Sequence, residues 1–294
     1  MALKIISFYK YTEIENPEKF RDEHQSLCEN LSLNGKIYIA FEGINGNVCG
    51  EEENINQYKN KLSSLKGFEN IIFKEDEISD YVFPKMHVRV KKELVNLSIE
   101  ELTNEKGGER LSPEKLLEFY ETGKDFIVID TRNSYESKIG HFKNALQPEM
   151  KNFREWPIVV ETLSEYKDKT IVTYCTGGIR CEKASAYLIK KGFKNVYQLD
   201  GGILTYIKKY PDTFWHGGMF VFDGRKVVEP NTKDELKHTA NCELCGNPTS
   251  YYINCHNLDC DKLIVCCKNC TTKYNYCCSQ KCEKSPRKRE RIYE

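Results

Sequence analysis

Residues 172–188 read VTYCTGGIRCEKASAYL and carry the strongest structural signal in the 294-residue chain. A short β-branched run ends directly before Cys175, and the stretch that begins at Cys181 is typical of an amphipathic helix. Two glycines and Arg180 lie between these two patterns. This order predicts a strand, a tight loop and a helix, with Cys175 as the first residue of the loop.

The segments around this loop repeat the alternation of helix and strand. A helix is predicted from Ser112, with Pro113 at its first position and Gly123 as its stop signal. Short β-branched runs follow in DFIVIDTR, KTIVTYC and NVYQLDG. The pattern predicts an α/β domain over residues 112–237, including a C-terminal extension, with a parallel sheet covered on both faces. Cys175 then lies at the carboxyl end of a strand, where such sheets usually place their sites.

Residues 1–98 show a different order, β-α-β-β-α-β. Strands are expected in LKIISFYKY, KIYIAF, GNVCG and NIIFKEDE, and helices over Pro17–Leu31 and Glu52–Lys66, with EGING joining the two middle strands. This order predicts an α+β domain of the ferredoxin-like, or acylphosphatase-like, type. Residues 99–111 are rich in charges and turn-forming residues, which indicates a linker.

Composition restricts the class of protein. The 44 basic and 44 acidic residues give a net charge of zero, so a polyanion must be met by local patches. The chain has no apolar run of about 18 residues and its first residues turn polar and acidic soon. We therefore expect a cytoplasmic protein that binds neither membrane nor DNA. No flavin, haem or nicotinamide motif is visible.

Ten of the 14 cysteines lie within residues 242–282, which in a chain without a leader favours metal binding over disulfides. Residues 238–294 are thus expected to form a cysteine-rich segment with a basic tail, KSPRKRER. Two C-x2-C pairs and two wider pairs supply eight thiolates for two structural zinc ions: Cys242, Cys245, Cys255, Cys260, Cys267, Cys270, Cys278 and Cys282. Sequential and interleaved pairing both remain open, Cys266 and Cys277 are left over, and His238 or His256 is an alternative ligand.

The loop itself suggests a reactive thiol. Glycines let successive backbone N–H groups turn inward, and these amides, the helix N-terminus and Arg180 would together bind an anion. The same field favours the thiolate of Cys175 and makes it a nucleophile. The alternative is a buried structural cysteine beside a glycine-rich turn. The loop comprises Cys175, Thr176, Gly177, Gly178, Ile179 and Arg180, followed by Cys181.

Several motifs together resemble a known family. DTRNSYESKIGHFKNAL (130–146), CTGGIRCEKASAYL (175–188) and LDGGI (199–203) are similar to a rhodanese domain. With AFEGINGNVCG (40–50) and WHGGMFVFDGR (215–225), the chain resembles the rhodanese-like tRNA uridine hydroxylases. The resemblance implies tRNA as the partner, and hydroxylation at C5 of the wobble uridine, position 34, to 5-hydroxyuridine. Dioxygen is then the expected co-substrate.

The resemblance also places Asp130 and Arg132 near the loop, where we interpret Asp130 as a structural organiser. Glu136 and His141 are interpreted as scaffold rather than acid-base catalysts. Cys181 either resolves an oxidised Cys175 or packs against the sheet.

In the first domain, Lys36, Tyr38, Asn45 and Arg89 are the expected RNA contacts, by analogy with other small sheets that bind RNA. The alternative is that EGING forms only a tight hairpin.

Two other functions are compatible with the same loop. A rhodanese-type sulfurtransferase would carry a persulfide on Cys175, but it would not need the first domain or the cysteine-rich segment. A non-catalytic RNA-binding or zinc-organised module would not need an intact Cys175 and Arg180. The loop is also one residue shorter than the C-x5-R loop of cysteine phosphatases, which argues against a phosphate substrate.

Overall fold

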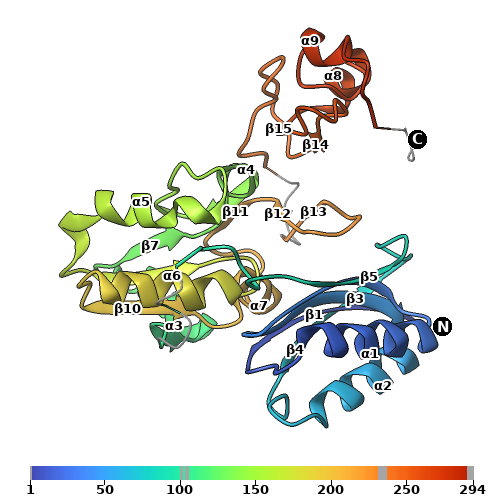
Figure 1. Cartoon of the computed structure of the whole chain (residues 1–294). Helices are drawn as coiled ribbons and strands as arrows, with labels where there is room; N and C mark the ends of the chain where they lie inside the picture. The colour runs from blue at the N-terminus through green and yellow to red at the C-terminus, as the bar shows by residue number, and fades with distance from the viewer. Residues whose placement is uncertain (1, 100–101, 103–105, 231–236, 290–294) are drawn as a thin grey trace.

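The computed structural model describes residues 2–99, 102, 106–230 and 237–289. Residues 2–98, the N-terminal unit, form a five-stranded sheet with two helices on one face (Figure 1). The sheet order is β4-β1-β3-β2-β5, with β5 parallel to β2 and the other pairs antiparallel. Its elements are β1 (Leu3–Tyr11), α1 (Pro17–Asn30), β2 (Asn34–Ala40), β3 (Gly43–Glu51), α2 (Glu52–Ser63), β4 (Ile72–Ile78) and β5 (Met86–Val90). The predicted ferredoxin-like order is confirmed, and β5 extends it by one edge strand.

The two faces of this sheet differ because successive side chains of a strand point in opposite directions. Ile6, Phe8, Ile37, Ile44 and Val48 are buried against α1 and α2. The opposite face carries polar and aromatic residues and turns toward the rest of the protein (Figure 1).

The turn between β2 and β3 lies one step earlier than the sequence indicates. Strand β3 begins at Gly43, so most of EGING is strand and the turn is made by Phe41 and Glu42. Gly43 has a φ of +140°, and a Cβ there would lie 2.0 Å from the carbonyl oxygen of Lys10. Only glycine allows β3 to pair with β1 this closely from its first residue.

The central unit, residues 109–217, contains a four-stranded parallel sheet of order β6-β10-β9-β7. Part of the expected linker forms β6, while residues 100–101 and 103–105 of it lie outside the described residues. The elements are β6 (Glu109–Leu111), α3 (Pro113–Glu121), β7 (Ile127–Asp130), α4 (Ser134–Ile139), β8 (Gly140–Phe142), α5 (Trp156–Thr162), β9 (Thr170–Tyr174), α6 (Ile179–Lys190), β10 (Asn195–Leu199), α7 (Gly202–Lys209) and β11 (Trp215–Gly217). Two 3-10 turns cover Phe153–Glu155 and Ser164–Tyr166.

Both faces of the parallel sheet are covered, as predicted. Ile129 and Ile171 pack with α5 and α6 on one face, whereas Val128 and Val172 pack with α3 and α7 on the other. Helix α3 starts at the predicted place, because the Ser112 side chain accepts a hydrogen bond from the backbone N–H of Lys115 at 3.2 Å.

The C-terminal segment, residues 237–289, lies beside α4 and away from the N-terminal helices (Figure 1). A short hairpin of β12 (Met219–Phe220) and β13 (Val227–Val228) precedes it. The segment contains β14 (Tyr252–Asn254), β15 (Leu263–Val265), α8 (Lys268–Lys273) and α9 (Gln280–Glu283). Its contact with the rest of the chain includes a small apolar cluster with Ile139, Phe220 and Tyr252, and a hydrogen bond from the Thr239 hydroxyl to the carbonyl oxygen of Lys138.

A buried ion triplet joins the N-terminal unit to α6. The ammonium of Lys183 lies 2.9 Å from carboxylate oxygens of both Glu42 and Glu93. The units are therefore held in a defined relation close to the Cys175 loop. Among the residues that the structure describes, no helix combines the length and apolar character needed to cross a bilayer.

Candidate active site and cysteine clusters

The predicted strand, loop and helix follow one another after β9, but α6 begins at Ile179, two residues earlier than the sequence indicates. Gly178 occupies the N-cap position of α6 with a φ of +100°, which favours glycine. The neighbouring helix α7 holds the start of the loop, because the N–H of Ile203 donates to the carbonyl oxygen of Cys175 at 3.0 Å. A Cβ on Gly202 would lie 2.5 Å from that same oxygen. A side chain at this position would therefore push the loop away from α7.

The sulfur of Cys175 is fully buried and surrounded by donors. The N–H of Gly178 lies 3.1 Å from it, and the amides of Arg180 and Cys181 also donate to it. Burial by itself raises the pKa of this thiol. The hydrogen bond from the Cys181 thiol, the charge of Arg180 and the backbone amides outweigh burial and lower the pKa to about 6. The geometry therefore favours a thiolate at neutral pH.

Arg180 is fixed by Glu136, a residue interpreted from the sequence as scaffold. Its two terminal nitrogens donate to the two carboxylate oxygens at 2.7 and 2.8 Å. Glu136 is completely buried and Arg180 is 8% exposed, so the guanidinium is held rigidly in a water-poor site. The charge of Glu136 offsets that of Arg180, and the loop therefore has little net charge before Cys175 ionises.

A second buried ion pair lies next to the strand residue that precedes the loop. Asp130 and Arg132 are both fully buried and make a two-pronged contact, and the hydroxyl of Tyr174 donates to Asp130 at 2.6 Å. Thr131 donates its backbone N–H and its hydroxyl to the carbonyl oxygen of Tyr174, at 3.0 and 2.9 Å. These contacts fix the residue that precedes Cys175.

The other loop residues differ in their surroundings. Cys181 is buried 3.7 Å from the Thr131 hydroxyl, and burial together with the neighbouring Cys175 raises the pKa of its thiol well above the usual value. The hydroxyl oxygen of Thr176 is buried and has no hydrogen-bond partner among the described residues. His141 bonds the carbonyl oxygen of Ser137 at 3.0 Å and takes no part in the loop.

One large aromatic residue close to the loop is exposed. Phe222 lies in the turn between β12 and β13 and is 52% exposed, and its ring centre is 5.8 Å from the guanidinium carbon of Arg180. Its immediate neighbour is the ring of Phe220, at 5.0 Å. The sequence motif WHGGMFVFDGR contains Phe222, but its spacing does not reveal that this ring reaches the loop.

The residues expected to contact RNA share one face of the N-terminal sheet. Tyr38 is paired with both Asn45 and Arg89, and Lys36 lies two positions along the same strand. The ammonium groups of Lys36 and Lys91 lie 5.4 and 5.3 Å from the ring centre of Tyr38. The structure thus brings the four residues together on the polar face, opposite α1 and α2.

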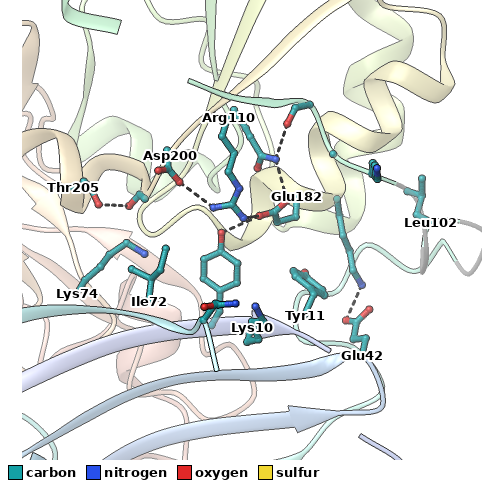
Figure 2. A pocket seen from close by; sticks show the side chains of 18 residues that line it. Lys10, Tyr11, Glu42, Ile72, Lys74, Leu102, Arg110, Glu182, Asp200 and Thr205 are labelled. Carbon is teal, nitrogen blue, oxygen red and sulfur yellow. Dashed lines mark hydrogen bonds and ion pairs between the residues drawn. The ribbon is translucent and has the colours of Figure 1, made fainter. Parts of the chain in front are cut away.

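A cavity of about 500 Å³ opens between the N-terminal and central units (Figure 2). Its wall includes Tyr11, Lys74 and Arg110. Arg110 bridges Glu182 and Asp200, at 2.5 and 2.9 Å. Cys175 does not line this cavity. Lys74 lines the cavity and also bonds the carbonyl oxygen of Gly177, so the cavity reaches the outer side of the loop.

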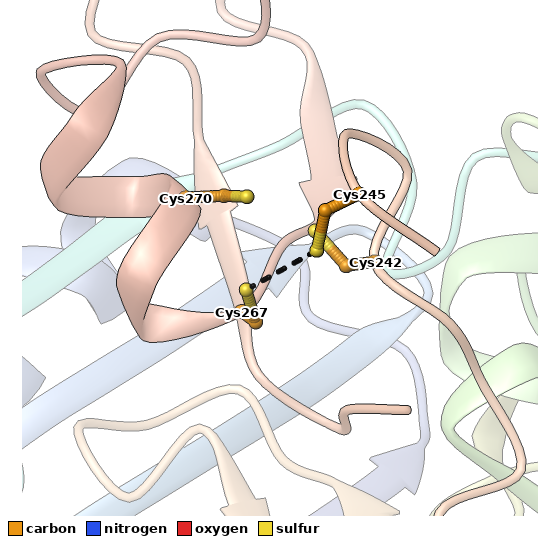
Figure 3. A group of neighbouring side chains, drawn as sticks. All are labelled: Cys242, Cys245, Cys267 and Cys270. Carbon is orange, nitrogen blue, oxygen red and sulfur yellow. Dashed lines mark hydrogen bonds between the residues drawn. The ribbon is translucent and has the colours of Figure 1, made fainter. Parts of the chain in front are cut away.

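The eight predicted cysteine ligands form two groups of four, and the pairing is interleaved. Figure 3 shows Cys242 and Cys245 from one loop converging with Cys267, at the start of α8, and with Cys270 of that helix. Within each group all sulfurs lie within 4.8 Å of one another, and those of Cys245 and Cys267 are 3.7 Å apart. Sulfurs at about 2.3 Å from a tetrahedral zinc ion would be about 3.8 Å apart. The group therefore fits zinc.

The second group consists of Cys255, Cys260, Cys278 and Cys282. Sulfur distances of 3.7 Å between Cys260 and Cys278, and 3.5 Å between Cys278 and Cys282, fit the same geometry.

The alternative metal ligands lie outside both groups. Cys266 and Cys277 are fully buried and belong to neither group. His238 bonds Ser250 at 2.9 Å, and His256 stacks on Tyr276 with ring centres 4.8 Å apart.

The contribution of the N-terminal unit to the loop is not visible in the sequence. Tyr9 on β1 donates its hydroxyl to Glu182 at 3.1 Å, and Lys74 on β4 donates to the carbonyl oxygen of Gly177 at 2.9 Å. Both residues lie on the polar face of the sheet, because they alternate along their strands with the core residues Phe8 and Phe73. This alternation is the one sign of their position that the sequence gives. Lys183 lies in the motif TGGIRCEKAS, which predicts a helix but not the ion pairs of this lysine with Glu42 and Glu93.

Comparison with known proteins covers nearly the whole chain. Residues 3–94 match a "UPF0176 acylphosphatase like domain", residues 112–209 a "Rhodanese-like domain" and residues 216–283 a "Rhodanase C-terminal" region. A protein of Acholeplasma laidlawii called "tRNA uridine(34) hydroxylase" is 46% identical over 97% of this chain and 91% of its own length. A protein of the same name from Staphylococcus saprophyticus is 44% identical over the same shares of the two chains.

A solved structure of the BH2092 protein from Bacillus halodurans is 27% identical, with a TM-score of 0.30. The match covers 35% of this chain and 74% of that one.

Proposed function

The chain belongs to the family of the tRNA uridine(34) hydroxylases, and we propose that it hydroxylates C5 of the wobble uridine of tRNA to form 5-hydroxyuridine. The thiolate of Cys175 is the proposed nucleophile. The observation that carries the proposal is a fully buried thiol bonded by backbone amides beside a fixed guanidinium, groups that lower its pKa. This loop lies in a chain that matches the named relatives over 97% of its length.

The chemistry starts with attack of the thiolate on C6 of a flipped-out uridine. A bond forms between sulfur and C6, and the electron pair of the C5–C6 double bond moves to C5 and the O4 carbonyl. C5 then attacks one oxygen of a peroxide-level donor, whose O–O bond breaks and releases hydroxide. Loss of the C5 proton and of the thiolate restores the double bond. The loop amides and Arg180 stabilise the thiolate of Cys175 before it attacks C6 and again when it leaves.

We propose dioxygen as the source of the new oxygen atom. With dioxygen, one atom enters the base and the other leaves as water, so that two electrons and two protons come from an external thiol reductant. Reduction of dioxygen to peroxide by that thiol would give the donor used in the steps above.

Access to the sulfur is a requirement of this proposal. Cys175 has no exposed surface, so a base must displace part of its cover to reach it. Phe222 is the exposed aromatic residue beside Arg180, and aromatic rings are the usual stacking partners of unpaired bases in RNA. We propose that Phe222 stacks on the flipped uridine or on its neighbour.

The polar face of the N-terminal sheet is the proposed contact for the remainder of the anticodon loop. Lys36, Tyr38, Asn45 and Arg89 offer positive charge and a stacking surface there. The zinc ions, when bound, cross-link the loops of the C-terminal segment. Part of the basic tail is neutralised locally, because Arg287 and Arg289 pair with Asp259 and Asp261, while residues 290 and 291 of it lie outside the described residues.

A nucleoside assay tests the proposal. Full-length protein with unmodified tRNA and a thiol reductant under air should form 5-hydroxyuridine, and isotopically labelled dioxygen should enter the product. Omitting any sulfur donor should not matter. Rapid sulfur transfer from thiosulfate to cyanide, with no change in the tRNA nucleosides, would instead identify a sulfurtransferase.

A further inference from the structure

A lysine of the N-terminal unit makes a hydrogen bond to the Cys175 loop. Lys74 projects from β4 and its ammonium donates to the carbonyl oxygen of Gly177 at 2.9 Å. The next residue, Gly178, donates its N–H to the sulfur of Cys175 at 3.1 Å. Both contacts involve the same peptide group, the one that joins Gly177 to Gly178.

The geometry of a trans peptide connects these two contacts. In a trans peptide the C=O and the N–H point in opposite directions in one plane. Lys74 therefore bonds the carbonyl oxygen, which is the end of the peptide group that points away from the sulfur. The positive charge of the Lys74 ammonium beside the carbonyl oxygen polarises the peptide group, and the hydrogen bond holds the peptide plane in one orientation. Both effects strengthen the hydrogen bond from the N–H to a thiolate.

Tyr9 restrains the same peptide from another side. Its hydroxyl would lie 3.1 Å from a Cβ placed on Gly178, and the ammonium of Lys74 is 5.4 Å from its ring centre. The hydroxyl is itself anchored on Glu182 of α6. The Gly177–Gly178 peptide thus lies against two side chains that belong to a different unit of the protein.

Among the residues that the structure describes, the ammonium of Lys74 makes its hydrogen bond to the loop and no ion pair with a carboxylate. Burial lowers the pKa of Lys74, and the negative charges of Cys175 and Asp200 oppose that effect, while Arg110 adds to it. The titratable groups around the loop include Tyr9 and Tyr11 from β1, Lys74 from β4, Arg110 from β6, Glu136 from α4, Arg180, Cys181 and Glu182 from α6, and Asp200 after β10.

We propose that Lys74 is a positioning residue for the Cys175 thiolate: it holds the Gly177–Gly178 peptide so that its N–H faces the sulfur. The reactive thiolate is then complete only when the N-terminal unit is docked on the central unit. This explains why a loop on the central sheet is combined with a second α/β unit that contacts it. The inference concerns the state of the thiol, and its consequence for RNA hydroxylation rests on the proposed function.

The test is the pH profile of alkylation of Cys175 by iodoacetamide in the full-length, zinc-loaded protein, followed by mass spectrometry of its peptide. In the native sequence the rate should rise with a midpoint near pH 6. Lys74→Met should move the midpoint upward by about one pH unit, because a stabilising charge on the donor peptide is lost. Lys74→Arg should recover most of the shift. Lys74→Gln keeps a neutral donor and should recover a smaller part of the midpoint shift. It replaces Lys74→Met in the test if that variant does not fold.

Lys208 provides the matched control. It lies on α7 and donates to the carbonyl oxygen of Glu75 at 2.6 Å, so it joins the same two units without touching the loop. Lys208→Met should keep the native midpoint. An unchanged midpoint in folded Lys74→Met or Lys74→Gln protein would overturn the proposal, and so would an equal shift in Lys208→Met. Alkylation needs no tRNA, so this result is independent of whether the protein hydroxylates uridine.

Discussion

Cys175 and the cysteines of the C-terminal segment are the same side chain in two opposite settings. Cys175 is surrounded by N–H donors and one guanidinium, and the sulfur of Cys181 lies beside it as a protonated neighbour. Each cysteine of the two clusters instead faces three other sulfurs within 4.8 Å. Four thiolates this close repel one another unless a cation lies between them, whereas a single thiolate among amides is already stabilised.

The difference shows that reactivity is decided by what surrounds the sulfur. The backbone N–H groups around Cys175 are held in place by the loop, and hydrogen bonds from them leave an electron pair of the sulfur available for attack on carbon. A metal ion occupies the corresponding electron pairs in the clusters and makes the sulfurs structural.

The largest effect is expected for Cys175→Ser. A serine hydroxyl does not ionise near neutral pH, so formation of 5-hydroxyuridine should fall by about a thousandfold or more while folding is retained. Cys49→Ser is the matched control, since Cys49 is also buried and bonds the backbone near Val82 and Phe83. Nucleoside analysis of tRNA measures both. Comparable activity in Cys175→Ser protein would exclude this residue as the nucleophile.

Removal of the guanidinium should have the next largest effect. Arg180→Ala should lower kcat/KM by about a hundredfold, because it removes a fixed positive charge beside the sulfur. It also leaves Glu136 buried and unpaired, which costs about 3–5 kcal/mol of stability. The double variant Arg180→Ala with Glu136→Gln should regain stability but not activity. Thermal unfolding and kinetics separate the two effects, and recovery of activity in the double variant would contradict a role for the charge.

The pH dependence of kcat/KM should follow the thiolate. With a pKa of about 6, Cys175 is ionised above that pH and protonated below it. The rate should therefore fall about tenfold per pH unit below pH 6 and level off above it. Initial rates from pH 5 to 8 test this. A rate that still rises steeply between pH 7 and 8 would show that the loop does not lower the pKa.

The smallest effect on chemistry is expected from the clusters. Purified protein should contain about two zinc ions, and Cys270→Ala should lose about one of them, because each site needs four ligands. The unfolding temperature should fall, while alkylation of Cys175 stays at its native rate. Metal analysis and calorimetry test this. Absence of metal from protein purified under reducing conditions without chelator would contradict the assignment of the clusters.

Local sequence patterns were enough to predict the succession of strands and helices in the N-terminal unit, a parallel sheet in the central unit and the strand-loop-helix at Cys175. These features depend on alternation and on glycine positions within a few residues. The contacts of Arg180 with Glu136 and of Lys74 with Gly177 join residues far apart in the chain, and no spacing rule encodes them. The interleaved cysteine pairing was left open for the same reason, since it depends on the path of β14 and β15.

The start of β3 at Gly43 also required the structure. The sequence EGING is compatible with a turn, and its strand conformation follows from the close approach of Lys10 on β1.

One labelling experiment tests the contrast between the two kinds of cysteine directly. Zinc-loaded protein is treated at pH 7 with one equivalent of iodoacetamide, and label, zinc and tRNA hydroxylation are measured on the same sample. We expect the label on Cys175, loss of hydroxylation in proportion to labelling, about two zinc ions retained, and protection by added tRNA. Label spread over the cluster cysteines with hydroxylation preserved, or full labelling of Cys175 with undiminished hydroxylation, would contradict the account.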